Sequence, residues 1–131
     1  MKIVFMGTSN FALPTLKLLV ENNANIVAVY TQPPRRAGRG NNFQLSPIGQ
    51  FAQDKRLKLL HPESFSSFAE IQMFKSLDPD LVIVVAYGLI LPEQLLAVSK
   101  IGFFNVHASI LPRWRGAAPI HRALLSNDKK T

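Results

Sequence analysis

The chain has 131 residues, of which 47% are hydrophobic and 18% are charged, and none is cysteine. This composition is typical of one globular domain with a buried core, and it excludes a disordered chain, disulfide bonds and thiolate metal sites. The formal net charge of +7 at pH 7 suits a polyanionic partner such as nucleic acid, but it also suits an ordinary solvated surface. No apolar run is long enough to cross a bilayer, and the N-terminal residues lack the long apolar region of a secretion signal.

Five apolar runs predict β-strands at residues 2–6, 25–31, 57–60, 80–87 and 102–107. Most are nearly continuous in Val, Ile, Leu and Phe, which is typical of strands covered on both faces, as in parallel sheets. Helices are predicted between and after the strands, at residues 10–21, 47–55, 66–77, 92–98 and 117–126. Pro14 fits the first turn of the first helix, and Ser46 fits the N-cap of the second. Strands that alternate with helices predict an α/β fold with a doubly wound, mostly parallel sheet.

Residues 31–47, TQPPRRAGRGNNFQLSP, are the one irregular stretch, and they are too long for an ordinary connection between a strand and a helix. Their Pro, Gly and Asn content predicts a loop, and three arginines suggest a charged partner. A flexible basic loop and a binding loop are equally open from these residues alone. The chain ends in polar residues just after its last predicted helix, so we expect it to be part of a larger protein.

Two glycine turns follow predicted strands. Gly7, in MGTSNF, could bring backbone N–H groups to an anion, but the sequence has neither the G-x-G-x-x-G fingerprint nor a P-loop lysine. A nicotinamide cofactor or a nucleoside triphosphate is therefore disfavoured, and a tight turn is the stronger interpretation. Gly88, in AYGLILP, follows the most apolar strand, at the edge where open α/β sheets bind ligands. Here a ligand loop and a tight turn are both open.

Asn105 and His107 lie two residues apart near the end of the last predicted strand, in FFNVHASILPRWRG. Strand residues at this spacing face the same side and are about 6.5 Å apart. An amide N–H and an imidazole aimed at one carbonyl suit acyl transfer. A structural histidine is the alternative, with Trp114 a core aromatic and its neighbouring arginines solvated.

Four motifs together resemble the methionyl-tRNA formyltransferase family: MGTSNFALPTL, TQPPRRAGRG, VVAYGLILP and NVHASILPRWRGAAPIHRALL. The resemblance covers nearly the whole chain. It implies a Rossmann-like formyltransferase fold, with residues 1–131 as the N-terminal, folate-binding domain. That domain is expected to be incomplete at its C-terminal end, and the family's C-terminal β-barrel tRNA-binding domain is expected to be absent. The implied reaction transfers a formyl group from 10-formyltetrahydrofolate to the amino group of methionyl initiator tRNA, for translation initiation.

The resemblance also implies roles for individual residues. Asn105 and His107 match two of the family's three catalytic residues. The third, an aspartate, is expected beyond Thr131, so the fragment itself is expected to be inactive, and Asp128 is not assigned to that role. The residues implied to bind folate are Tyr87, Gly88, Leu89, Ile90, Leu91, Ser109, Ile110, Leu111 and Pro112. Those implied to bind tRNA are Arg35, Arg36, Gly38, Arg39, Gly40, Arg113 and Arg115.

No metal is expected, because the three histidines are scattered along the chain. The remaining expectations are a monomer when complete, no membrane partner, and a location in the bacterial cytoplasm or an organellar matrix. Other possibilities are a 10-formyltetrahydrofolate-dependent formyltransferase that acts on a sugar-nucleotide or purine-precursor amine, and a non-catalytic basic RNA-binding module. A nucleotide-binding Rossmann domain is a weaker alternative, since Gly7 stands alone.

Overall fold

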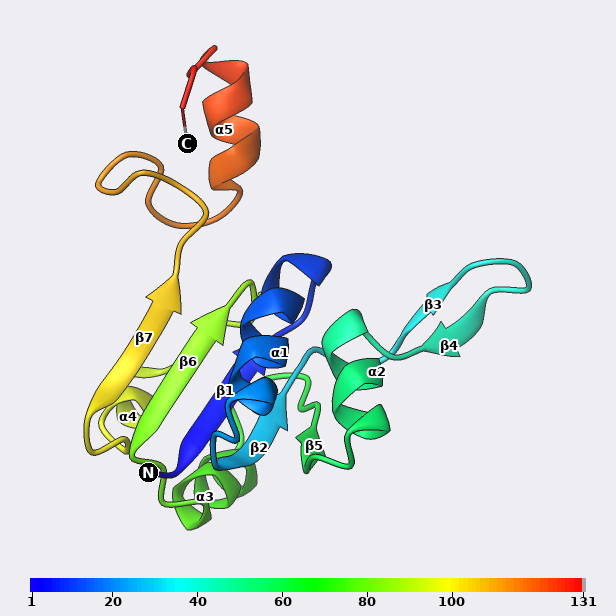
Figure 1. The fold of residues 1–131 in the computed structure, drawn as a ribbon, viewed down its shortest axis with the longest axis vertical. Helices are drawn as coiled ribbons and strands as arrows, with labels where there is room; N and C mark the ends of the chain where they lie inside the picture. The colour runs from blue at the N-terminus through cyan, green and yellow to red at the C-terminus, as the bar shows by residue number, and fades with distance from the viewer. Residues whose placement is uncertain (131) are drawn as a thin grey trace.

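The computed structural model describes residues 1–130, so Thr131, the last residue of the predicted domain, lies outside the described residues. Five strands form its central sheet: β1 (Ile3–Gly7), β2 (Ile26–Tyr30), β5 (Leu59–Leu60), β6 (Leu81–Val85) and β7 (Gly102–Val106). Their order across the sheet is β5-β2-β1-β6-β7 (Figure 1), and every pairing between them is parallel. The predicted parallel α/β sheet is therefore confirmed.

Helices cover both faces of this sheet. A 3-10 turn, η1 (Asn10–Ala12), leads into α1 (Leu13–Glu21), and α2 (Pro47–Asp54), α3 (Phe68–Ser76), α4 (Glu93–Leu96) and α5 (Pro119–Leu125) follow along the chain. α1 and α2 lie on one face, and α3 and α4 lie on the other (Figure 1). The doubly wound arrangement is thus confirmed for these four helices. α5 lies beyond the end of β7, away from both faces (Figure 1).

Alternate side chains of the inner strands enter two separate hydrophobic cores. Val4 and Met6 of β1 join the core that contains Phe74 of α3, whereas Phe5 joins the core that contains Leu16 of α1. All five side chains are fully buried. Because neighbouring positions of a strand face opposite sides, a strand covered on both sides has to be apolar throughout, which explains the continuous apolar runs of the sequence.

The start of α2 is held by side-chain hydroxyls. The Ser46 hydroxyl oxygen accepts a hydrogen bond from the Gly49 N–H at 2.9 Å, and Pro47 occupies the first turn. This confirms Ser46 as the N-cap. The same hydroxyl contacts that of Thr31, a buried residue directly after β2. These contacts fasten the start of α2 to the end of its neighbouring strand.

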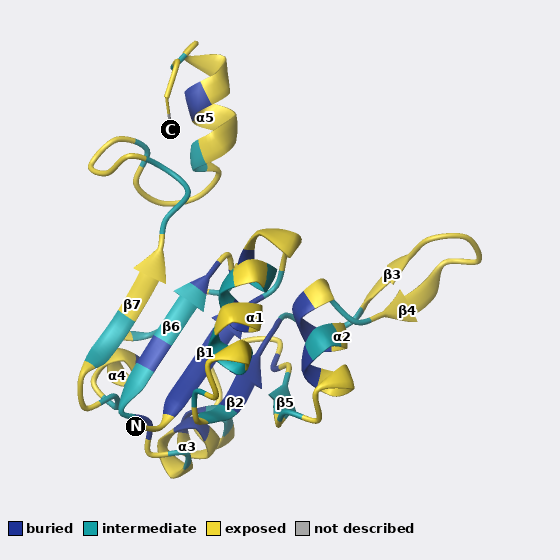
Figure 2. Ribbon diagram, viewed as in Figure 1, coloured by how far each residue is buried: buried dark blue, intermediate teal, exposed yellow. Residues whose placement is uncertain are grey.

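A β-hairpin occupies the middle of residues 31–47, so the prediction of an irregular loop there is wrong. β3 (Arg35–Ala37) and β4 (Asn42–Gln44) pair antiparallel, and the hairpin projects from the body of the molecule with every residue of both strands exposed (Figure 2). The turn uses positive φ angles at Gly38, Gly40 and Asn41, which glycine and asparagine adopt readily. The side chains cross the hairpin as well, since the Arg36 guanidinium lies 4.8 Å from the centre of the Phe43 ring.

β7 differs from the other long strands because it is not covered on both sides. It is the edge of the described sheet, and its Phe104 and Val106 are 57% and 46% exposed (Figure 2). The covering on both faces that most of the apolar runs predict therefore does not extend to this last strand. The physical reason is that the chain after β7 turns away from the sheet and places α5 beyond it (Figure 1).

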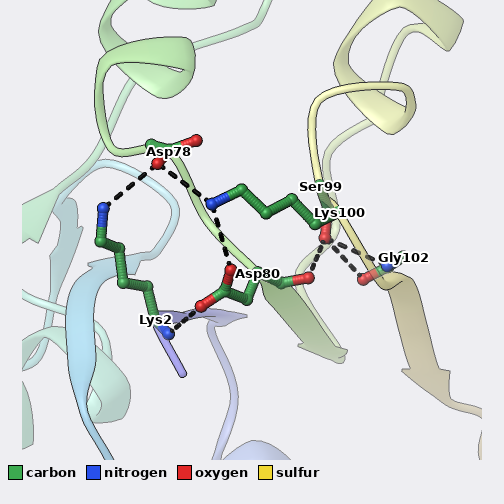
Figure 3. Close-up of polar contacts among 6 residues, drawn as sticks. All are labelled: Lys2, Asp78, Asp80, Ser99, Lys100 and Gly102. Carbon is green, nitrogen blue, oxygen red and sulfur yellow. Dashed lines mark hydrogen bonds and ion pairs between the residues drawn. The ribbon is translucent and has the colours of Figure 1, made fainter.

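The amino ends of β1, β6 and β7 are joined by a polar network (Figure 3). The Lys2 backbone N–H donates to Asp80 Oδ2 at 2.6 Å, and the Nζ atoms of Lys2 and Lys100 each lie 3.2 Å from Asp78 Oδ2. The Ser99 hydroxyl donates to the Asp80 carbonyl at 2.8 Å. Exposed ion pairs stabilise little individually, so the main effect of this network is to align three strand starts at the end of the sheet away from α5.

Candidate active site

A cavity of about 860 Å³ lies at the carboxyl end of the sheet. The chain proceeds from β1 outward to β2 and β5, and then crosses to β6 and β7 on the other side of β1. The strand order thus reverses between β1 and β6. Thr8, which follows β1, and Ala86, which follows β6, both line the cavity. In open α/β sheets this reversal point is where ligands bind.

Asn105 and His107 both line this cavity. Asn105 is the last residue but one of β7, and His107 comes directly after the strand. Their side chains therefore meet the same space, as their spacing of two residues predicts. The Asn105 side-chain amide makes no hydrogen bond to any other residue within 1–130, so its N–H groups can donate to a molecule in the cavity.

The His107 ring is fixed by hydrogen bonds at both nitrogens. Nδ1 lies 2.8 Å from the Ser109 hydroxyl, and Nε2 lies 3.1 Å from the Gly116 carbonyl oxygen. The Ser109 hydroxyl donates in turn to the Arg113 carbonyl at 2.7 Å. Carbonyl oxygens only accept, so Nε2 donates to Gly116. The Ser109 hydroxyl has one proton, which it can share with either the Arg113 carbonyl or Nδ1.

The loop Tyr87–Leu91 lines the cavity along its whole length. Its first residue, Tyr87, is buried, with a ring that packs 6.4 Å from that of Phe65 in the core. Burial raises the pKa of the Tyr87 phenol above its ordinary value, so this side chain anchors the loop as a neutral group. Gly88 has φ +89°, and a Cβ there would lie 2.0 Å from Gln32 Nε2. The positive φ favours glycine, and any other residue would have to push the Gln32 amide aside.

The segment Ser109–Pro112 lies outside the residues that line the cavity. Ile110 and Leu111 are 58% and 55% exposed. In this structure the segment approaches the site through Ser109 alone, by way of the hydrogen bond to His107.

The predicted tRNA-binding residues fall into separate groups. Arg35 lines the cavity, whereas Arg36, Gly38, Arg39 and Gly40 lie farther out on the hairpin. Two more arginines lie in the turn before α5. The Arg113 guanidinium is already paired with Asp128, through bonds of 2.7 and 2.9 Å, while Arg115 makes no ion pair with the rest of the described chain.

Sequence reasoning missed Gln32, which also lines the cavity. Its Nε2 donates to the Tyr87 carbonyl at 3.1 Å, and its Oε1 accepts a hydrogen bond from Arg35 Nη2. The Thr8 hydroxyl donates to the same Tyr87 carbonyl at 2.7 Å. A usable signal was present, because Gln32 follows a predicted parallel strand and so had to lie at the same edge as the other site residues.

Among the residues that the structure describes, no group of three or more His, Asp or Glu side chains is arranged to hold a metal ion. None of the helices in residues 1–130 has both the length and the apolar character that crossing a membrane requires.

The formyl transferase family model matches residues 1–131, the whole chain. The chain belongs to the formyl transferase family. The chain is 50% identical over 131 residues to a curated methionyl-tRNA formyltransferase from Parvibaculum lavamentivorans. It is 51% identical over 132 residues to one from Rhizobium rhizogenes. Both alignments cover 100% of the chain and 42% of the relative. The resemblance seen in the sequence motifs is therefore confirmed over the full chain.

Solved structures show the same fold at low sequence identity. A phosphoribosylglycinamide formyltransferase from Bacillus halodurans superposes with a TM-score of 0.75 and 14% identity, covering 97% of this chain and 66% of that one. A formyltetrahydrofolate deformylase from Pseudomonas syringae pv. tomato gives a TM-score of 0.71 and 22% identity, covering 95% of this chain and 41% of that one. The expected Rossmann-like formyltransferase fold is thus confirmed.

Proposed function

We propose that residues 1–131 are the formyltransferase domain of a methionyl-tRNA formyltransferase. The reaction is transfer of a formyl group from 10-formyltetrahydrofolate to the α-amino group of methionyl initiator tRNA. The observation that carries this proposal is the meeting of Asn105, His107 and the loop Tyr87–Leu91 at one cavity. The level of identity to curated methionyl-tRNA formyltransferases, 50% over the whole chain, supports this acceptor over a sugar-nucleotide or purine-precursor amine.

The cavity fits a folate donor in size and in chemical character. Pockets for ligands of this size usually enclose roughly 300–1,000 Å³ and combine apolar walls with a few polar groups. Leu89, Leu96 and Phe103 supply apolar wall here, and Asn105 and His107 supply polar groups. In this proposal the loop Tyr87–Leu91 holds the donor against that wall. The donor supplies the formyl group, and the protein supplies its orientation.

Asn105 is the proposed hydrogen-bond donor to the formyl oxygen. When the amine of the acceptor attacks the formyl carbon, this oxygen gains negative charge. An amide N–H already aimed at that position stabilises the charge without reorganising. A free α-amine has a pKa near 8, so a useful fraction is neutral and able to attack near pH 7.

His107 is the proposed second donor or proton carrier, and in either role its ring exchanges one of its two present hydrogen bonds for a contact to the substrate. The hydrogen bonds to Ser109 and Gly116 hold its ring in place before substrate binds. A ring N–H turned toward the cavity stabilises negative charge that develops on a substrate oxygen.

The hairpin is the proposed contact to the acceptor RNA. Arg36 and Arg39 project with it from the body of the molecule, where they can reach phosphates that cannot enter the cavity. Arg35 lies at the cavity itself. The hairpin would thus hold the RNA while the aminoacyl end reaches Asn105. The curated relatives named above are bacterial, which favours a bacterial cytoplasm as the location.

An acceptor comparison tests the proposal. The full-length protein is incubated with 10-formyltetrahydrofolate and either methionyl initiator tRNA, phosphoribosylglycinamide or an amino-sugar nucleotide. We expect formylation of methionyl-tRNA at a rate at least about a hundredfold above the others. Formylation of a small amine in preference to methionyl-tRNA would identify a different formyltransferase. Binding of RNA without any transfer would identify a non-catalytic RNA-binding module.

A further inference from the structure

We propose that Gln32 is a positioning residue that couples the RNA-binding hairpin to the donor-binding loop. This inference rests on the proposed function. It concerns one carboxamide that touches both regions: its Oε1 accepts from Arg35 at the start of β3, and its Nε2 donates to the carbonyl of Tyr87 at the start of the loop.

The orientation of the Gln32 amide is determined by its two neighbours together. A flip of the amide by 180° would place Nε2 against the Arg35 guanidinium and Oε1 against the Tyr87 carbonyl oxygen. Each of those pairs would set two donors or two acceptors against each other. Arg35 therefore helps to keep Nε2 directed at Tyr87, and Tyr87 helps to keep Oε1 directed at Arg35.

The surroundings of Gln32 leave its side chain little freedom. Its backbone N–H donates to the Thr8 hydroxyl at 3.3 Å, and that hydroxyl donates to the same Tyr87 carbonyl at 2.7 Å. The amide also lies so close to Gly88 that an added Cβ would approach within 2.0 Å of Nε2. The residues that follow β1, β2 and β6 are thus joined through one carbonyl oxygen, that of Tyr87 at the start of the loop.

Coupling follows from this arrangement. A phosphate that binds the hairpin and orders Arg35 also orders the Gln32 amide, and the amide then holds Tyr87 and Gly88 in the conformation that lines the cavity. A charged donor at one end of a hydrogen-bond chain also strengthens the next bond in it. Since coupling is reciprocal, 10-formyltetrahydrofolate must raise the affinity of the protein for RNA by the same factor as RNA raises its affinity for 10-formyltetrahydrofolate.

The test measures this coupling factor in the full-length protein. The dissociation constant of 10-formyltetrahydrofolate is determined with and without a saturating RNA hairpin that copies a tRNA acceptor stem. We expect the RNA to tighten donor binding about fivefold in the parent protein, the effect of roughly one hydrogen bond. In Gln32→Glu, which keeps an acceptor for Arg35 but loses the donor to Tyr87, the factor should fall to about one. Gln72→Glu, at an exposed glutamine of α3, is the matched control and should leave the factor unchanged.

A double-mutant cycle separates coupling from simple structural damage. If Arg35 acts through Gln32, then Arg35→Met and Gln32→Met should each lower the coupling factor by the same amount. The double variant should show no further loss beyond that of either single variant. A coupling factor in Gln32→Glu equal to that of the parent contradicts the inference, as does a parent factor of one. In both cases donor and RNA still bind, so the proposed function stands. Failure of the parent protein to bind either ligand contradicts the proposed function itself.

Discussion

The indole nitrogen of Trp114 donates a hydrogen bond to Oδ2 of Asp128 at 2.7 Å. The same carboxylate receives two bonds from Arg113, whose guanidinium lies 4.3 Å from the centre of the Trp114 ring. This cluster ties the turn that follows His107 to the residues after α5. The Asp128 carboxylate is therefore a direct attachment between this turn and the residues that follow α5.

Protonation of Asp128 at low pH should break its contacts with Arg113 and Trp114 in a transition that fluorescence can follow. Hydrogen bonds from Arg113 and then Trp114 lower the pKa of Asp128 from 3.8 to about 2. A carboxylate with a lowered folded pKa contributes stability that is complete above its unfolded pKa and is lost as the pH falls through the folded value. Trp114 is the only tryptophan, so its fluorescence should change with a midpoint near pH 2. Asp128→Asn should abolish this step and Asp54→Asn should not, whereas a midpoint near pH 4 would show that the carboxylate is unpaired.

Gly7→Ala should destabilise the protein through overcrowding. A Cβ at this position would lie 2.8 Å from the Ala12 Cβ and 2.9 Å from the Val85 carbonyl oxygen, and a backbone atom cannot move aside without shifting β6. We expect the free energy of unfolding in denaturant to fall by about 1–3 kcal/mol. Gly49→Ala is the matched control, since its nearest neighbour would lie at 3.3 Å and alanine favours the helix. Equal effects from both substitutions would contradict the close approach at Gly7.

Phe74→Ala and Phe68→Ala should differ sharply although both positions belong to α3. Phe74 is fully buried, with its ring 5.7 Å from Tyr30 and 5.9 Å from Phe103, whereas Phe68 is 77% exposed. Truncation of a buried phenylalanine costs about 3–5 kcal/mol. Denaturation should show a loss of this size for Phe74→Ala and a change within about 0.5 kcal/mol for Phe68→Ala. A similar loss for both would mean that α3 is rotated relative to the arrangement described.

The fold followed from the apolar runs where a strand is covered on both sides. β1, β2 and β6 have this character, and a parallel sheet built from them could be predicted because continuous apolar runs suit strands covered on both faces. α3 illustrates the limit: the sequence has Phe68, Ile71 and Phe74 at regular spacing, but only the latter two are buried. Periodicity finds the apolar stripe of a helix, and tertiary contacts decide where that stripe ends.

Neither the hairpin nor the contacts of Gln32 could be predicted from the sequence, and the reasons differ. The strands Arg35–Ala37 and Asn42–Gln44 carry no alternating apolar pattern, because neither side of the hairpin packs on a core. Their glycine-rich turn was the only local signal. Gln32 is recognised through its partners, Thr8 and Tyr87, which are distant in sequence. Asn105 and His107 were found because both lie within one strand end.

Arg39→Ala should weaken RNA binding in a way that salt reveals. Arg39 lies in the turn of the projecting hairpin, and each phosphate contact adds about 0.9 to the slope of log affinity against log salt. For the RNA that copies the acceptor stem, the magnitude of the slope of log affinity against log salt should therefore fall by about one in Arg39→Ala. Lys75→Ala removes a charge from α3, below the sheet and away from the projecting hairpin (Figure 1), and should leave the slope unchanged. If both variants lower the slope equally, the RNA is bound by net charge rather than by the hairpin.

The central claim is that Asn105 acts on the formyl oxygen from the wall of the donor cavity, and turnover of Asn105→Ala in the full-length protein tests it most directly. Losing one such donor should lower kcat by about a hundred- to a thousandfold, with the Kd of 10-formyltetrahydrofolate within about threefold of the parent value. Asn105→Asp, which keeps the shape but loses the N–H groups, should be equally slow. A kcat for Asn105→Ala within a few-fold of the parent would contradict the account.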